Sequence, residues 1–212
     1  MVREGFRLVL QAEIDIKVVG EAENGRQAVE LARNLKPAVI VMDLSMPLLN
    51  GLEATRRIHH ALPTIKILIL SAYDDDAYVD QISEVGAAGF VLKQSASDAL
   101  ILAIREVYKG KSFFSVSLAN RIRRRTHISS GLDGRLRNQR NRLSSREVEV
   151  LQLIAEGSSN KRVAEMLGIS AKTVDKHRQH LMTKLDHHET ASLTRYAIST
   201  GVIESNVQLT ID

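Results

Sequence analysis

The stretch "VIVMDLSMPLLNG", Val39 to Gly51, decides how the first half of the chain folds. A short apolar run ends in one carboxylate, Asp43, and is followed by a segment that contains Pro47. Such a run is typical of a parallel strand that is covered on both faces. Because ligands of open α/β sheets bind at the carboxyl ends of the strands, the sequence predicts that Asp43 stands at a ligand site.

Three further apolar runs lie near residues 16–22, 65–72 and 88–93, and segments with a period near 3.6 residues separate them. Alternation of strands and helices predicts βαβ units with right-handed crossovers. Residues 1–112 are therefore expected to form an α/β domain, a doubly wound parallel sheet with helices on both faces.

The second half of the chain has a different pattern. Residues 113–141 are rich in arginine, glycine and polar residues without a sustained apolar period, which predicts a linker. From Leu143 onward the periodicity is helical only, and residues 142–207 are expected to form a small all-α domain.

Composition narrows the class of protein. The chain is 44% hydrophobic and 25% charged, and no apolar run approaches the roughly 20 residues that span a bilayer. The absence of cysteine excludes disulfides and thiolate chemistry, and the N-terminal residues do not resemble a secretory signal. A soluble, cytoplasmic protein without a membrane partner is expected.

The net charge of +4 is distributed unevenly. Residues 1–115 carry 13 Lys/Arg and 15 Asp/Glu, whereas residues 116–212 carry 16 and 10. The second half is thus net basic, which favours contact with a polyanion such as DNA. A solvated basic surface explains the charge equally well.

Two more polar residues follow predicted strands. Ser71 ends the run "LILS" and Lys93 ends the run "GFVLK", so both are expected beside Asp43 at one edge of the sheet. A carboxylate, a hydroxyl and an ammonium suit transfer of a phosphoryl group to the carboxylate, because the cation and hydroxyl can stabilise phosphoryl oxygens. For Asp43 alone, capping of the following turn is the alternative.

With "MPLLNG" after Asp43, residues 1–112 resemble the receiver domain of two-component response regulators. The resemblance implies a flavodoxin-like fold in which a sensor histidine kinase phosphorylates Asp43. It also implies that Ser71 is the switch hydroxyl, that Lys93 pairs with the phosphoryl group, and that Phe90 moves with the switch.

The resemblance also implies a Mg²⁺ site at Asp43 and the carbonyl of Ser45. In the family, an additional first strand ends in two acidic residues that hold the ion, but here "VREGFRLVLQ" already resembles the first helix. Weak Mg²⁺ binding is therefore expected. Glu21 and Glu23 either substitute for the acidic pair or serve as caps and solvated charges. Either the chain starts inside a longer receiver, or the receiver is degenerate and is completed by strand exchange in a dimer.

Residues 143–203 resemble the LuxR-type helix-turn-helix domain of NarL/FixJ-family response regulators. Within "NKRVAEMLGISAKTVDKHRQ", Ala164 is small where two helices cross, Gly168 accommodates a positive φ, and Ser170 can cap the second helix. An ordinary helical hairpin shares these three features, and the longer match distinguishes the two. The resemblance implies four helices, with Ala171 to Lys184 as recognition helix in the major groove.

The resemblance assigns roles within the DNA-binding domain. Phosphate contacts are expected from Lys172, Thr173, His177 and Arg178. Base-edge contacts are expected from Asp175, Lys176 and Gln179, for which solvated charge is the alternative. The predicted DNA-binding set also includes Asn160 and Lys161. Dimerisation is expected through Leu193, Ala197 and Ile198 of the last helix, where core filling is the alternative.

The sequence therefore predicts a DNA-binding transcriptional regulator, a homodimer and not an enzyme, whose phosphorylation state controls promoter binding. Expected partners are double-stranded DNA, a sensor histidine kinase and RNA polymerase. One alternative is a phosphorylation-independent regulator whose shortened receiver is an interaction or dimerisation module. Another is an aspartyl-phosphate hydrolase with Asp43 as nucleophile, although such enzymes have a second acid where Ser45 stands.

Overall fold

The chain divides into two compact units, residues 1–127 and 128–212. The computed structural model describes residues 2–72, 81–82, 84–95, 97–114 and 143–203. All but the first two residues of the predicted linker lie outside these ranges. Among the described residues, no helix is both long enough and apolar enough to cross a membrane.

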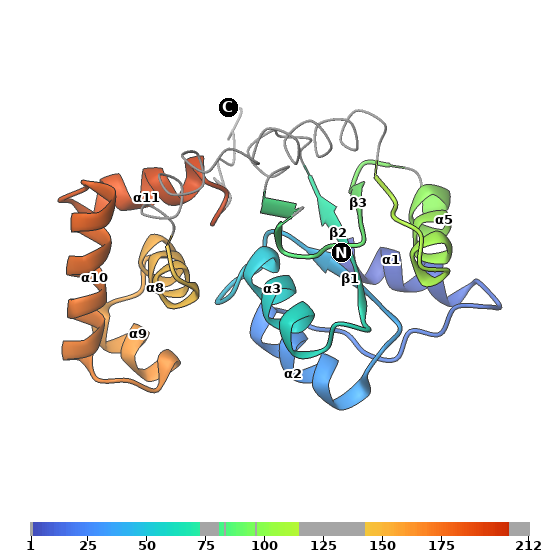
Figure 1. Ribbon diagram of the computed structural model, residues 1–212, viewed down its shortest axis with the longest axis horizontal. Helices are drawn as coiled ribbons and strands as arrows, with labels where there is room; N and C mark the ends of the chain where they lie inside the picture. Colours follow the sequence, from blue (N-terminus) through green and yellow to red (C-terminus); the bar gives the residue numbers. More distant parts are fainter. Residues whose placement is uncertain (1, 73–80, 83, 96, 115–142, 204–212) are drawn as a thin grey trace, which may run out of the picture. The chain divides into compact units, whose positions relative to one another are not determined.

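The first unit is built on a parallel sheet with the order β1-β2-β3 (Figure 1). The strands are β1 (Val39–Asp43), β2 (Lys66–Ser71) and β3 (Gly89–Leu92). Asp43 lies opposite Leu70, and Ser71 lies opposite Leu92. The carboxyl ends of the three strands therefore meet at one edge, which confirms the predicted α/β architecture.

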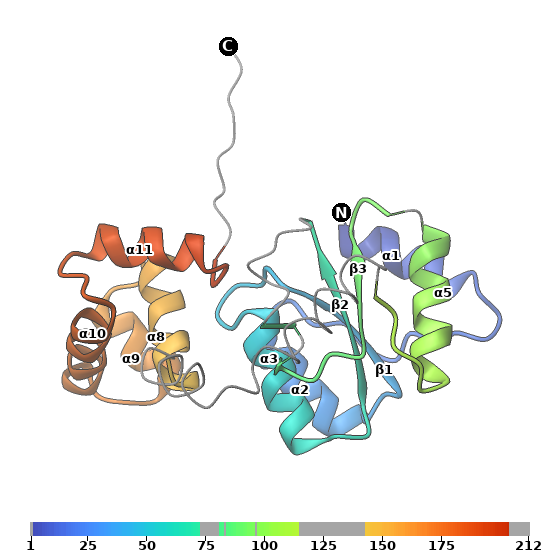
Figure 2. The same cartoon turned by 45° about the horizontal axis from the view of Figure 1, so that its top comes forward.

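Helices cover both faces of this sheet (Figure 2). The helices α2 (Gly25–Leu35) and α3 (Gly51–Ala61) pack on one face, and α1 (Val2–Gln11) and α5 (Ser97–Tyr108) pack on the other. Alternation along the strands produces this division, because successive side chains point to opposite faces. Met42 contributes to the first core, whereas Val41 packs against the second.

The predicted strand at residues 16–22 is wrong, because this segment forms no strand in the structure. Among the described residues β1 pairs only with β2, so its other edge has no strand neighbour. Residues 16–22 and β1 both line a cavity of about 510 Å³, to which Ile16 and Val18 contribute from the first segment and Val39 and Val41 from β1. A strand requires backbone hydrogen bonds to a neighbouring strand. An apolar composition, as in residues 16–22, favours a strand but does not provide that neighbour.

The second unit contains α8 (Ser145–Ala155), α9 (Asn160–Leu167), α10 (Ala171–Leu185) and α11 (Thr190–Ser199). These elements confirm the predicted four-helix domain. The N-caps of α8, α9 and α10 are serines whose hydroxyl accepts from a backbone N–H of the first turn. Gly168 has φ of 62° and ends α9, which lets the chain turn directly into α10.

Glu147 joins the start of α8 to the last turn of α10. Its carboxylate accepts from Ser144 N at 2.7 Å, completing a capping box, and from Lys184 Nζ at 2.9 Å. Burial raises the pKa of Glu147, but the bonds from Lys184 and Ser144 outweigh burial and lower the pKa. The ionised carboxylate therefore stabilises the fold above the ordinary glutamate range, and this contribution is lost as pH falls through the folded-state pKa.

Glu147→Gln should lower the stability of α8 at pH 7 by about 1 kcal/mol and should flatten its loss of stability as pH falls below the ordinary glutamate range. Amide hydrogen exchange in α8 of the full chain measures both effects. Glu165→Gln is the control, because Glu165 is exposed and its ion pair with Arg162, at 3.5 Å, contributes little. An unchanged pH dependence in Glu147→Gln would exclude this carboxylate as the acid-sensitive group.

Candidate functional site

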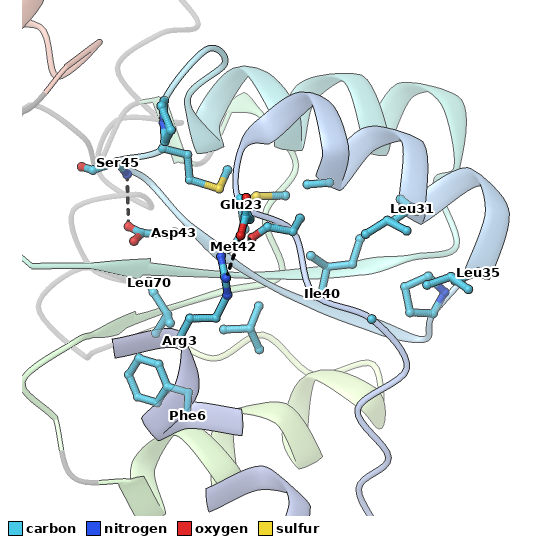
Figure 3. A pocket seen from close by; sticks show the side chains of 18 of the residues that line it. Arg3, Phe6, Glu23, Leu31, Leu35, Ile40, Met42, Asp43, Ser45 and Leu70 are labelled. Carbon is cyan, nitrogen blue, oxygen red and sulfur yellow. Dashed lines mark hydrogen bonds and ion pairs between the residues drawn. The ribbon is translucent and has the colours of Figure 1, made fainter. Parts of the chain in front are cut away.

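Asp43 is the last residue of β1, and both of its carboxylate oxygens are engaged. Lys93 Nζ lies 2.6 Å from Oδ2. Ser45 N donates to Oδ1 at 3.1 Å (Figure 3). The side chain of Asp43 is 33% exposed and that of Lys93 is 22% exposed. The carboxylate is thus oriented by the protein and still open to a reactant from solvent.

The loop after Asp43 turns back closely on the strand. Leu44 N donates to Leu70 O, which extends the sheet by one bond, and Gly51 N donates to Leu44 O. A Cβ on Gly51 would lie 1.9 Å from the carbonyl oxygen of Asp43. Only glycine fits there, so Gly51 fixes how the start of α3 approaches the carboxylate.

Ser71 and Phe90 lie on the face of the sheet that α3 covers. Ser71 is 3% exposed at the end of β2, and its carbonyl accepts from Lys93 N at 2.7 Å. Phe90 is 7% exposed and packs in an apolar cluster with Ile69, two residues before Ser71. The structure thus brings the predicted residues Asp43, Ser71 and Lys93 to one sheet edge, with Phe90 in the adjoining core.

The carboxylates of Glu21 and Glu23 are held by a guanidinium. Arg3 lies 3.1 Å from Glu21 and 3.2 Å from Glu23. Glu23 lines the same cavity of about 280 Å³ as Asp43 and Ser45 (Figure 3). In the described part of the chain no three acidic or histidine side chains form a group that could hold a metal ion. The residues present do not fit a dedicated octahedral Mg²⁺ site.

In the second unit, α10 presents a continuous exposed stripe along one side. The exposed residues of the helix are Ala171, Lys172, Asp175, Lys176, Gln179, His180 and Thr183. Their spacing of three to four residues places them on one face. This stripe contains all three predicted base-edge residues. The stripe also contains His180 and Thr183, which are not in the predicted DNA-binding set although their spacing from Lys176 follows the same helical period.

The predicted DNA contacts outside this stripe differ in exposure. Thr173, His177 and Arg178 are half-buried, and the Thr173 hydroxyl lies 2.8 Å from that of Ser170. At the start of α9, Lys161 is exposed and Asn160 is half-buried.

The predicted dimerisation residues divide into two groups. Leu193 and Ala197 are fully buried in the core of the unit, in a cluster that includes Leu151 and Leu181. Ile198 is 38% exposed. The exposed face of α11 also carries Ala191 and Arg195, which are not among the predicted dimerisation residues.

Comparison with known proteins assigns both units. The family model described as "Response regulator receiver domain" matches residues 1–105, and "Bacterial regulatory proteins, luxR family" matches residues 141–197. The oxygen regulatory protein NreC of Staphylococcus haemolyticus is 39% identical over 209 residues, which cover 96% of this chain and 95% of that protein. NreC of Staphylococcus aureus is 39% identical over 206 residues, with the same coverage.

Solved structures support the same assignment of the two units. The response regulator RcsB of Salmonella typhimurium is 29% identical with a TM-score of 0.60, covering 94% of this chain and 92% of that one. RcsB in complex with DNA is 29% identical with a TM-score of 0.53, covering 94% and 93%. The predicted combination of domains is confirmed. The chain belongs to the two-component response regulators that join a receiver domain to a LuxR-type DNA-binding domain, a family of transcriptional regulators.

Proposed function

We propose that Asp43 accepts a phosphoryl group from a sensor histidine kinase, and that this modification controls dimerisation and promoter binding. The observation that carries the proposal is the ion pair between Lys93 Nζ and Asp43 Oδ2, at 2.6 Å, at the carboxyl edge of the sheet. A carboxylate held there is a nucleophile beside a cation that can stabilise the charge of an incoming phosphoryl group.

In the proposed reaction a carboxylate oxygen of Asp43 attacks the phosphorus of a phosphohistidine. The P–N bond breaks, its electron pair returns to the imidazole, and an acyl phosphate forms on Asp43. Lys93 then pairs with a phosphoryl oxygen, and the Ser71 hydroxyl approaches another. Because Ser71 and Phe90 share a sheet face, movement of the first repacks the cluster around the second.

Receiver domains generally bind Mg²⁺ at their phosphorylation site. The described side chains around Asp43 do not form such a site by themselves, so the steps above use only Lys93 and Ser71. This observation favours a second candidate function, in which the receiver acts as an interaction or dimerisation module and the regulator binds DNA without phosphorylation.

The proposed output is sequence-selective binding of double-stranded DNA by a homodimer. The exposed stripe of α10 supports placement of this helix in the major groove, and related RcsB structures include two dimers bound to two DNAs. Ile198 and the exposed face of α11 are the proposed dimer contact, with RNA polymerase as a further partner. The proposed domain limits are 1–112 and 142–207, joined by a linker at 113–141, and the family models match residues 1–105 and 141–197.

Treatment with acetyl phosphate tests the proposal against its alternative. The affinity of the full chain for its preferred DNA should rise at least about tenfold after treatment, since coupling between sites is typically 1–3 kcal/mol. Asp43→Asn should show no response. Fluorescence anisotropy with labelled DNA measures both proteins. Equal affinity before and after treatment would favour the phosphorylation-independent regulator.

Two lysines on the exposed stripe should have different effects on DNA binding. Lys172→Ala should weaken binding similarly on all sequences and reduce the salt slope by about one unit, because a phosphate contact carries no sequence information. Lys176→Ala should cost about 1–3 kcal/mol on the preferred site and much less on random DNA. Titrations at several salt concentrations measure both, and equal losses on both DNAs would remove Lys176 from base reading.

A further inference from the structure

A polar network at the start of α9 joins three helices of the DNA-binding unit. The side-chain amide of Asn160 donates from Nδ2 to Asp175 Oδ1 and accepts at Oδ1 from an Arg178 NH1 donor at 2.9 Å. Arg178 also donates from NH2 to the Thr190 hydroxyl at 2.8 Å. Asn160 and Thr190 are the first residues of α9 and α11, whereas Asp175 and Arg178 both belong to α10.

The network permits only one orientation of the Asn160 amide. An asparagine side chain offers an acceptor on one atom and donors on the other. Here the donors face the carboxylate of Asp175 and the acceptor faces the guanidinium of Arg178. If the amide were reversed, its oxygen would face the Asp175 carboxylate and its NH2 group would face the Arg178 guanidinium. Arg178 therefore orients Asn160, and Asn160 orients Asp175.

Asp175 is the member of the network that also lies on the exposed stripe of α10. An exposed carboxylate without a partner would exchange among rotamers, and ordering it would cost free energy when DNA binds. The contact with Asn160 uses Oδ1, and a carboxylate has about four lone-pair sites on its two oxygens. The held carboxylate is thus preset to accept from one further donor.

We propose that Asn160 sets the base preference of this protein by holding the Asp175 carboxylate, while Arg178 fixes the orientation of the Asn160 amide. The proposal rests on the proposed placement of α10 in the major groove. The ligand of Asp175 is then an exocyclic amino group, foremost that of cytosine, whose N4 donates in the major groove. Asn160 is a positioning residue in this account, and its loss acts on one base pair through Asp175.

The test compares base preferences of the full chain, its variants Asn160→Ala and Asp175→Ala, and the double variant. Binding to a random-sequence duplex pool gives the preference at each position. Asp175→Ala should lose about tenfold discrimination at one base pair, the scale of one good base contact. Asn160→Ala should lose most of the discrimination at the same base pair and keep the others. The double variant should lose no more than Asp175→Ala, because both changes remove one interaction.

Two further variants keep the result interpretable. Glu165→Gln changes an exposed residue of the same helix and should retain every base preference. Asn160→Asp retains the shape of the side chain but places a carboxylate against Asp175, so it should reproduce the loss even if the alanine variant folds poorly.

Four results would overturn the inference. Full discrimination in Asn160→Ala would show that Asp175 needs no positioning. An equal loss on all sequences would make Asn160 a phosphate contact. Unchanged discrimination in Asp175→Ala would remove the carboxylate from base reading, and the proposed function would survive if the other preferences remained. A wild-type chain without any sequence preference would contradict both the inference and the proposed function.

Discussion

Gly51→Ala should lower the free energy of unfolding of the receiver by about 3 kcal/mol, near the upper end of the cost of overpacking. The added Cβ would lie 1.9 Å from the carbonyl oxygen of Asp43 and 3.0 Å from the Cα of Leu44. Both atoms belong to the backbone, so no side-chain rotation relieves the overlap. The loop or α3 must move, and the bond from Gly51 N to Leu44 O lengthens or breaks.

Amide hydrogen exchange in β1 and β2 of the full chain measures this change. Gly5→Ala is the matched control, because Gly5 lies in α1 with no atom within 4 Å of an added Cβ. That substitution should be neutral or stabilise α1 by up to about 1 kcal/mol, owing to the better helix propensity of alanine. Similar protection of β1 in both variants would mean that the loop after Asp43 is looser than the structure indicates.

Lys93→Ala should slow the incorporation of phosphate at Asp43 by about 100-fold or more, the usual consequence of removing one group that stabilises developing charge. Lys93 is the cation in contact with the Asp43 carboxylate, at 2.6 Å. Its loss also leaves the partly buried carboxylate without the cation that balances its charge.

The rate of incorporation from acetyl phosphate, followed by intact-protein mass, measures this effect. Lys66→Ala is the control. Lys66 is the first residue of β2 and lies at the amino ends of the strands, away from Asp43, so this substitution should leave the rate unchanged. If Lys93→Ala incorporates phosphate as fast as the wild-type chain, Lys93 has no part in the transfer.

Local sequence patterns predicted those parts of the fold that local forces determine. The apolar runs of β1, β2 and β3 and the helical periods gave the elements and their order, because burial of each element depends mainly on its own side chains. The segment 16–22 has the same composition as a strand, yet a strand also requires a neighbour for its backbone hydrogen bonds. Composition alone does not specify such a neighbour, whereas the resemblance to receiver domains, which have an additional strand before the first helix, bears on it directly.

The candidate sites follow the same division. Asp43, Ser71 and Lys93 were predictable because strand ends of a parallel sheet meet at one edge. By contrast, Leu193, Ala197 and Ile198 share one helical period, and periodicity cannot separate a core face from a dimer face. The contacts of Asn160 with Asp175 and Arg178 depend on rotamers across two helices, and no pattern along the chain encodes them.

The central claim is that Asp43 is a phosphoryl acceptor in this chain. A phosphate-affinity gel of the full chain after incubation with acetyl phosphate and Mg²⁺, beside Asp43→Asn, tests it most directly. The account predicts a slower band for the wild-type chain that is absent from the variant. A wild-type chain that circular dichroism shows to be folded and that gives no slower band would contradict it.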